Sequence, residues 1–302
     1  MNAAVLADCV LGYAARFLPD AVWVSADTWV TAQAMGAPVV FPDGDQPLAG
    51  TGEPRVRTAA DIDRIPAPDP GSQGRWPLML EAVRRVRRGL GADGFLVACF
   101  DQYPFSLACA LMGIQNVMVK LLDDPGLVEA LMDRCAEFTI AYGLALAEAG
   151  ADMLSGGDSP AGLIGPVLYR QVAWPFERRV IETLKLRTGI PVSLHICGQA
   201  APLLPAMAES GADVLELDHQ VAIEQACRIA KPETVLWGNL DPVRLLAFGT
   251  PREVRQATRS LIRTFQANGH SRFVVSSGCT LAVDTPTDNL QALFDETRSG
   301  EP

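Results

Sequence analysis

The feature that most constrains the fold is the regular alternation of short β-rich runs with longer helical patterns. The predicted strands fall at 21–27, 95–101, 151–158, 190–197, 212–218, 234–239 and 272–279. The predicted helices lie between them, at 77–90, 124–150, 166–189, 200–211, 251–269 and 286–298. Such alternation is typical of a parallel sheet with helical crossovers. With a possible eighth strand at 37–41, the sequence predicts a single α/β domain over residues 1–302, a (β/α)8 TIM barrel.

One segment breaks this alternation. Residues 42–75 are rich in Pro, Gly and Asp, and they fit no strand or helix pattern. A connection of this length is uncommon in a compact domain unless it has a function of its own. We expect a long loop here, forming a lid or a hairpin insertion.

Charge and cysteine usage narrow the classes of partner. The net charge is −10, from 35 acidic and 25 basic residues, so nucleic acid and anionic membranes are poor partners. The apolar runs are too short or too interrupted to span a bilayer, and the N-terminus lacks the basic start of a signal peptide. The seven cysteines stand at irregular spacings, which favours reduced thiols. We therefore expect a cytoplasmic protein.

Polar residues able to do chemistry end nearly every predicted strand. In a barrel these ends meet at one mouth, where the active sites of this fold lie. The residues concerned are Asp27, Asp101, Asp158, His195, Cys197, Asp218, His219, Asn239 and Cys279.

Three of these residues suggest a metal site. His195 and Cys197 are two apart on one strand, so they face the same way, and Cys279 is a third soft ligand at the end of the last predicted strand. Zinc binds imidazole and thiolate, and three protein ligands leave a position open for a substrate. A thiol bound there would lose its proton and remain electron-rich. The alternative is that these cysteines only fill the core.

The motifs around these ligands resemble a known family. LHICG at 194–198, GADVLELD at 211–218, GNLDP at 238–242 and GCTLAVDTPTDNL at 278–290 are similar to the uroporphyrinogen decarboxylase superfamily. The nearer match is its zinc-dependent methylcobalamin:thiol (coenzyme M type) methyltransferase branch. The resemblance covers roughly residues 95–298. It implies a TIM barrel and zinc held by His195, Cys197 and Cys279. The activity it implies is methyl transfer between a methylated corrinoid, such as methylcobalamin, and a small thiol.

The resemblance also suggests further site residues. Asp158 and Asp218 match acidic positions of the family, and the sequence does not choose between them as the catalytic acid. Candidate substrate-binding residues are Asp101, Gln102, Tyr103, His219 and Asn239. His219 is equally compatible with a place on the barrel rim, and Asn239 with shaping the strand end. The chain has no corrinoid-binding motif, so we expect the corrinoid on a separate protein.

Departures from the family pattern leave alternatives open. The N-terminal region is shorter than is usual in the family, and the usual Gly-Pro before PF is replaced by 101-DQYPF-105. One alternative is a corrinoid-dependent demethylase that moves a methyl group from an O-, N- or S-methyl substrate to cob(I)alamin. A second is a decarboxylase-like enzyme acting on a tetrapyrrole, against which the mostly acidic strand ends argue. A third is a non-catalytic zinc or corrinoid carrier.

Overall fold

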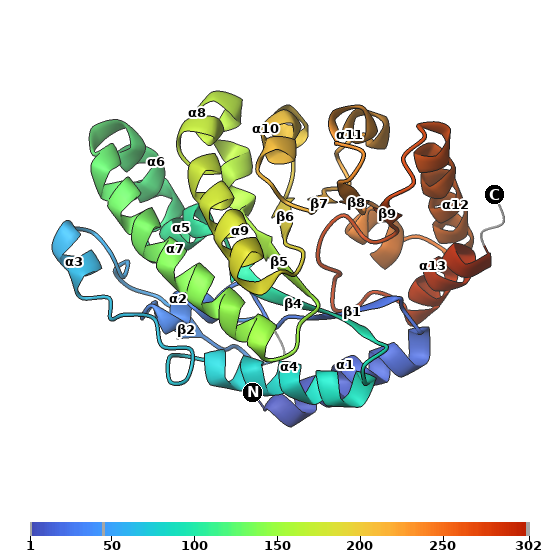
Figure 1. Ribbon diagram of the computed structural model, residues 1–302, viewed down its shortest axis with the longest axis horizontal. Helices are drawn as coiled ribbons and strands as arrows, with labels where there is room; N and C mark the ends of the chain where they lie inside the picture. Colours follow the sequence, from blue (N-terminus) through green and yellow to red (C-terminus); the bar gives the residue numbers. More distant parts are fainter. Residues whose placement is uncertain (1, 44–45, 300–302) are drawn as a thin grey trace.

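A curled parallel sheet forms the centre of the molecule (Figure 1). The computed structural model describes residues 2–43 and 46–299. Within them, seven parallel strands are hydrogen-bonded in the order β1-β4-β5-β6-β7-β8-β9, so β1 and β9 are the two edges. The strands are β1 (Ala21–Val24), β4 (Phe95–Gln102), β5 (Met153–Gly157), β6 (Ser193–Ile196), β7 (Val214–Leu217), β8 (Val235–Trp237) and β9 (Phe273–Val274).

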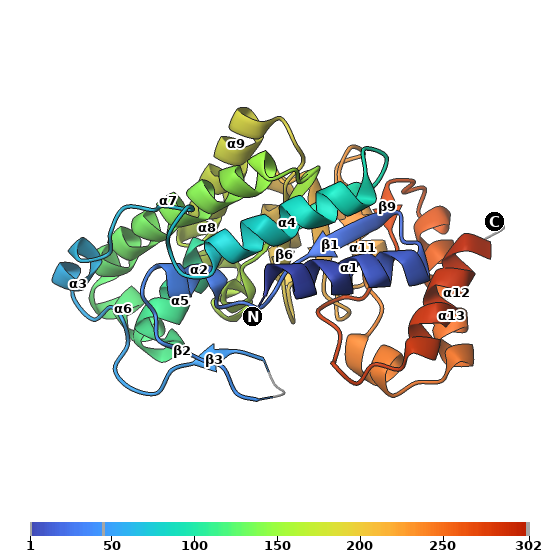
Figure 2. The same cartoon turned by 90° about the horizontal axis from the view of Figure 1, so that it is seen from below.

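Helices cover the outside of this sheet (Figures 1 and 2). The longer helices are α1 (Ala3–Phe17), α4 (Trp76–Leu90), α7 (Pro125–Glu148), α9 (Trp174–Thr188), α12 (Pro251–Ala267) and α13 (Thr287–Ser299). Shorter helices are α2 (Val30–Ala34), α3 (Ala59–Asp63), α5 (Pro104–Met112), α6 (Ile114–Asp123), α8 (Gly165–Gln171), α10 (Leu204–Glu209) and α11 (Ile223–Ile229). Three single-turn segments, η1 (Ser159–Leu163), η2 (Ala201–Leu203) and η3 (Pro242–Ala247), complete the connections.

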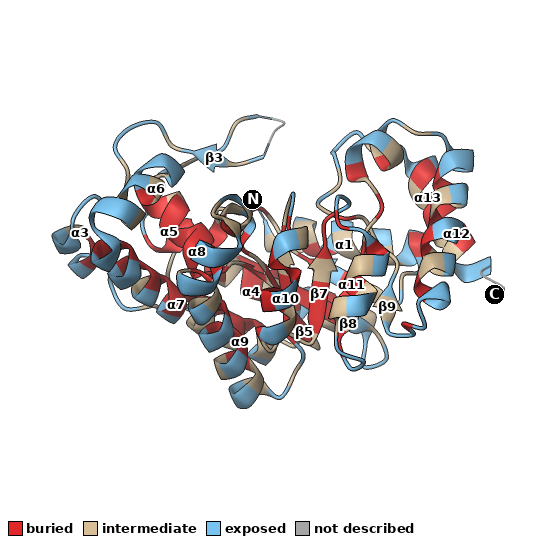
Figure 3. Ribbon diagram, turned by 90° about the horizontal axis from the view of Figure 1, so that it is seen from above, coloured by how far each residue is buried: buried red, intermediate tan, exposed pale blue. Residues whose placement is uncertain are grey.

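Side-chain alternation along the strands divides the core into two parts. One set of strand residues packs outward against the helices and belongs to the large continuous core, which appears red in Figure 3. The other set faces the interior of the curled sheet, where Val97, Met153 and Val214 form a separate buried cluster. This second cluster is the apolar plug that closes the barrel interior near the amino ends of the strands.

The TIM-barrel prediction is confirmed, but the proposed eighth strand is wrong. Residues 39–40 form β2 (Val39–Val40), which pairs antiparallel with β3 (Leu48–Ala49) in a hairpin apart from the main sheet. Pro38 and Pro42 flank β2, and proline cannot donate to a ladder, so this segment is too short for a central strand. The hairpin begins the long segment for which an insertion was one of the two expectations.

Several predicted boundaries also need correction. The helix predicted at 166–189 is two helices, α8 and α9, and the break precedes Pro175, near the start of α9. The last strand ends at Val274, so Cys279 lies in the loop after β9 and not at its end. Helix α1 lies in a stretch for which the sequence predicted no helix.

The carboxyl ends of the strands open toward one side of the molecule. In Figure 2 the β2–β3 hairpin and the orange segment around η3 project on that same side, and both follow strand ends. In the described residues, no single helix is long and apolar enough to cross a bilayer. Helices α5 and α6 meet the criterion only as a pair, and they are bent by 104°.

Candidate metal centre at the barrel mouth

Three side chains with soft ligand atoms converge at the mouth. The ring nitrogen or sulfur atoms of His195, Cys197 and Cys279 all lie within 4.8 Å of one another. Nε2 of His195 is 2.8 Å from Sγ of Cys197, and the two sulfurs are 3.3 Å apart. His195 comes from β6, Cys197 from the loop directly after it, and Cys279 from the loop after β9. The fold thus brings together residues that are more than 80 positions apart.

The ring of His195 is oriented by a backbone contact. Its Nδ1 atom is 3.1 Å from the carbonyl oxygen of Glu216 on β7. Because a carbonyl oxygen can only accept, Nδ1 must carry the hydrogen of this bond. In the neutral ring the lone pair of Nε2 then points at the sulfurs. Hydrogen bonds of this kind orient the histidine ligands of metal sites.

The two thiols share their protons unequally. A hydrogen bond from Cys279 lowers the pKa of Cys197 to about 7, while the same bond raises the pKa of Cys279 to about 12. Burial alone would lower the pKa of His195, but its contact with Cys279 and the negative charge of Glu216 outweigh burial and raise it. Of the two thiols, Cys197 therefore loses its proton more readily.

Asp218 and Asn239 hold the loops that carry the ligands. Asp218 is 4% exposed, and its Oδ2 accepts a 2.8 Å hydrogen bond from the amide of Gly198, the residue after Cys197. Asn239 donates from Nδ2 to the carbonyl oxygens of Asp218 and Val221, at 2.9 and 2.7 Å. Asp218, predicted as a catalytic acid, thus fixes the Cys197 loop, and Asn239 shapes the neighbouring strand end.

His219 lies on the rim beside these residues. Its Nδ1 is 3.2 Å from Oδ1 of Asp218, and its Nε2 is 3.7 Å from Oδ2 of Asp241. The side chain is 33% exposed, so it is reachable from the mouth. A histidine between two carboxylates is well placed to exchange protons with a substrate.

A close backbone contact fixes the third sulfur. A Cβ atom added at Gly278 would lie 2.4 Å from the backbone nitrogen of His219 and 2.9 Å from its Cα. Real side chains do not approach backbone atoms so closely, so only glycine allows the chain to pass here. This passage brings the next residue, Cys279, beside Cys197.

Asp158, the other predicted acid, belongs to a buried carboxyl pair. Its Oδ1 accepts hydrogen bonds from the amide and hydroxyl of Ser106, both 2.7 Å, at the start of α5. Oδ2 of Asp158 and Oε1 of Glu177 are both buried, and neither has a hydrogen-bond partner among the described residues. Burial raises the pKa of Asp158 to about 6, and burial together with Asp158 raises that of Glu177 well above its ordinary value. One proton must therefore be held between the two carboxyls.

The remaining predicted residues lie at the end of β4. Asp101 is 8% exposed and accepts a 3.1 Å hydrogen bond from the amide of Thr31; burial raises its pKa well above the ordinary value. Tyr103 is fully buried, and its hydroxyl donates to the carbonyl oxygen of Ser193. Gln102 has a buried side-chain oxygen for which the described residues offer no partner. Of these three residues, Tyr103 is the most enclosed by protein.

An acid inside the barrel, Glu216, was not among the predicted site residues. Glu216 on β7 pairs in register with His195, and its Oε1 accepts hydrogen bonds from the hydroxyls of Ser155 (2.7 Å) and Ser193. The signal was available, because residues two apart on a strand share a face, and Glu216 precedes Asp218 by two as Ser193 precedes His195.

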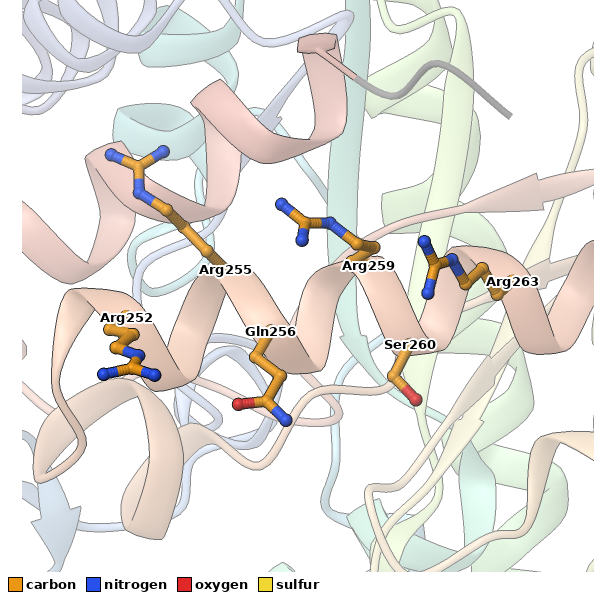
Figure 4. A pocket seen from close by; sticks show the side chains of 6 residues that line it. All are labelled: Arg252, Arg255, Gln256, Arg259, Ser260 and Arg263. Carbon is orange, nitrogen blue, oxygen red and sulfur yellow. The ribbon is translucent and has the colours of Figure 1, made fainter.

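A hollow on the outer face of α12 is unrelated to this site. It is lined by six residues of that helix, and Figure 4 shows the guanidinium groups of Arg255 and Arg259 on the side of the neighbouring helix. These two arginines form ion pairs with Asp295 and Glu296 of α13. Such a helix face is an ordinary solvated surface.

Comparison with known proteins places this chain in a family. A sequence model of uroporphyrinogen decarboxylase (URO-D) matches residues 1–300. The methylcobamide:CoM methyltransferase MtbA of Methanosarcina acetivorans is 30% identical over 226 residues, 74% of this chain and 64% of that protein. The uroporphyrinogen decarboxylase of Gloeobacter violaceus is 28% identical over 293 residues, 95% of this chain and 81% of that protein.

A solved structure shows the same fold. The structure of a methyltransferase from Methanosarcina mazei superposes with a TM-score of 0.89 at 24% identity, covering 99% of this chain and 86% of the other. This chain spans slightly less than two thirds of the M. acetivorans relative. Since the family model covers nearly the whole chain, this protein belongs to the uroporphyrinogen decarboxylase family, and the resemblance found in the sequence is confirmed.

Proposed function

We propose that this protein transfers a methyl group between a methylated corrinoid and a small thiol, with zinc held by His195, Cys197 and Cys279. The observation that carries the proposal is the convergence of one imidazole and two thiols at the barrel mouth. The similarity to the methylcobamide:CoM methyltransferase supports it. That similarity alone would not decide, because a decarboxylase relative covers more of the chain.

The chemistry of the donor set fits zinc. One nitrogen and two sulfur ligands within 4.8 Å of one another match the ligand types of zinc sites that keep a position open for substrate. The backbone contact at Nδ1 leaves Nε2 of His195 available for a metal. Bound zinc would stabilise the thiolate form of a thiol substrate, because the cation attracts negative charge.

The residues of this chain supply positioning. Asp218 holds the Cys197 loop, Gly278 lets Cys279 reach the cluster, and His219 lies at the rim where a thiol proton can leave. In the transfer, the thiol loses its proton to solvent and its sulfur forms a bond to the methyl carbon. The cobalt–carbon bond breaks with both electrons remaining on cobalt, which yields a Co(I) corrinoid. No further reactant is needed.

Two other activities of the same site remain as alternatives. In the reverse direction, a methylated small molecule would give its methyl group to cob(I)alamin. Decarboxylation of a tetrapyrrole is favoured only by the decarboxylase relatives. Acidic side chains at the mouth, among them Asp218 and Asp241, make it a poor site for a substrate with many carboxylates.

The test is to purify the chain without added metal, measure its zinc content, and assay it with methylcobalamin and thiols. About one zinc per chain and formation of a methyl thioether would support the proposal. Demethylation of a small methyl donor by cob(I)alamin, without thiol methylation, would establish the reverse activity. Consumption of uroporphyrinogen by zinc-free protein would replace the proposal with decarboxylation.

A further inference from the structure

The barrel interior beneath the candidate metal centre carries an unusual acid. Glu216 sits on β7 between Val214, which belongs to the apolar plug, and Asp218 at the strand end. Its neighbours Leu215 and Leu217 are buried in the large continuous core between the sheet and the helices, whereas Glu216 is only partly buried. Alternation along the strand therefore turns its side chain into the interior, between the plug and the metal centre.

The carboxylate of Glu216 is held in place on one side only. The hydroxyls of Ser155 and Ser193 both donate to Oε1, from the two strands preceding β7 in the sheet. Among the described residues, no hydrogen bond reaches Oε2. The two serine donors orient the carboxyl group and leave Oε2 able to accept from a ligand.

This carboxylate lies close to the candidate metal ligands. Glu216 and His195 are register partners on adjacent strands. A small thiol with its sulfur at the metal centre would therefore place its other end within the field of this carboxylate.

Further acidic side chains lie at the rim of the mouth. Asp218 and Asp241 add carboxylates at the rim. Arg75, beside the end of β1, is paired through both of its terminal nitrogens with Asp27. The tail of a bound thiol thus meets negative charge both from Glu216 and from the rim.

We propose that Glu216 makes this site selective for thiols whose other end is cationic or donates hydrogen bonds, and that it disfavours thiols with an anionic tail. The inference rests on the proposed function and names the substrate class of the same site. Glu216 would contact the tail of the thiol while the sulfur reacts at the metal centre, so Glu216 would set specificity and take no part in the chemical step.

The experiment uses three thiols on the same two-carbon chain. They are 2-mercaptoethanesulfonate, neutral 2-mercaptoethanol, and 2-(trimethylammonio)ethanethiol, whose quaternary nitrogen cannot coordinate a metal. Both charged tails are tetrahedral and of similar size. For each thiol, kcat/KM with methylcobalamin is measured, and binding to the zinc-loaded protein is measured separately by calorimetry.

Wild-type protein should prefer the cationic thiol to the sulfonate by about tenfold or more, in binding and in kcat/KM, as expected for one charge contact in a partly buried site. Glu216→Gln should reduce that ratio by about tenfold. Comparing ratios cancels the intrinsic reactivity of each thiol. Glu216→Asp should keep the preference, and Glu209→Gln, which removes an exposed acid paired with Arg170, should leave it unchanged.

The outcomes separate the two proposals. Methylation of all three thiols with a preference for the sulfonate, or a ratio that Glu216→Gln leaves unchanged, would overturn the role of Glu216 and leave the activity intact. Selective binding of the cationic thiol without turnover of any thiol would support the role of Glu216 and overturn the methyl transfer. If Glu216→Gln does not fold, the wild-type preference still decides.

Discussion

The triad at the mouth (His195, Cys197 and Cys279) and the Asp158–Glu177 carboxyl pair after β5 are both clusters of titratable groups, but they differ in their exposure to solvent. In both, titratable groups lie close enough together to shift one another's pKa values. His195, Cys197 and Cys279 are each partly exposed, so a metal can enter and displace their protons. Asp158 and Glu177 are fully buried, so they must keep a proton between them. From this difference we expect that access, more than residue type, decides whether such a cluster binds a ligand or stabilises the fold.

The largest effect is expected for Cys279→Ala. We expect it to lose zinc and methyl transfer while the fold remains intact, because Cys279 lies in a loop and contributes little to the core. Elemental analysis, circular dichroism and the methylcobalamin assay measure the three properties. Cys227→Ala removes a half-buried thiol of α11 outside the triad and should change none of them. An active, zinc-free Cys279→Ala would exclude the proposed metal centre.

Glu177→Leu should have the reverse effect of Cys279→Ala: it should destabilise the fold and leave the zinc content unchanged. It leaves Oδ2 of Asp158 buried without a donor and removes the 2.5 Å contact from the hydroxyl of Tyr169, so we expect a loss of about 3 kcal/mol in unfolding free energy. Chemical denaturation measures this loss, while zinc content should stay near one per chain. Glu182→Leu, an exposed position on the same helix, is the control and should cost less than about 0.5 kcal/mol. A similar small cost for both variants would mean that the pair holds no proton.

Zinc affinity should depend on pH because zinc and protons compete for the triad. The pKa of Cys279 is raised to about 12, so this thiol gives up a proton when a metal binds at neutral pH. Affinity should therefore rise with pH, by about tenfold per unit for each displaced proton. Chelator competition at several pH values between 6 and 9 gives the slope. A flat profile would indicate that the metal does not bind through the thiols.

The smallest effect concerns the pH dependence of stability. The pKa values of Asp158 (about 6) and Glu177 are raised in the folded state, so their contribution is present below the unfolded values near 4 and is lost as pH rises through the folded values. The unfolding free energy should fall with rising pH by at most about 1.4 kcal/mol per unit for each proton. In Glu177→Gln, the side-chain amide can donate a hydrogen bond to Asp158 and does not titrate, so this variant should show a smaller dependence of stability on pH. Equal slopes in both proteins would assign the pH dependence to other groups.

The sequence predicted the parts of the site that follow from strand periodicity. His195 and Cys197 are two apart on a strand, and a barrel brings strand ends together, so their shared direction followed from pattern alone. The seven strand positions were predicted for the same reason. The eighth strand failed because the short apolar run at 39–40 is compatible with both a barrel strand and a hairpin, and only pairing distinguishes them.

Contacts between distant helices and strands were beyond sequence patterns. Glu177 lies in a helix whose charged residues mostly face solvent, and nothing local indicates that it points at Asp158. Asp218 was predicted as a chemical group, yet its oxygens are used to hold backbone amides of the mouth. Glu216 was within reach of the periodicity argument, but an acid in the middle of an apolar strand is easily assigned to the surface.

The contact between Gly278 and the backbone of His219 has a consequence for how such a site can vary. The position of Sγ of Cys279 depends on the close approach of the Gly278 backbone to the His219 backbone, and no side chain at position 278 can adjust this distance. Enlarging that residue by one methyl group would separate the two loops, and the cluster would keep its first two ligands but lose the third. Gly278 carries a hydrogen atom where any other amino acid would carry Cβ, and we expect this difference to determine whether the mouth presents three metal ligands or two.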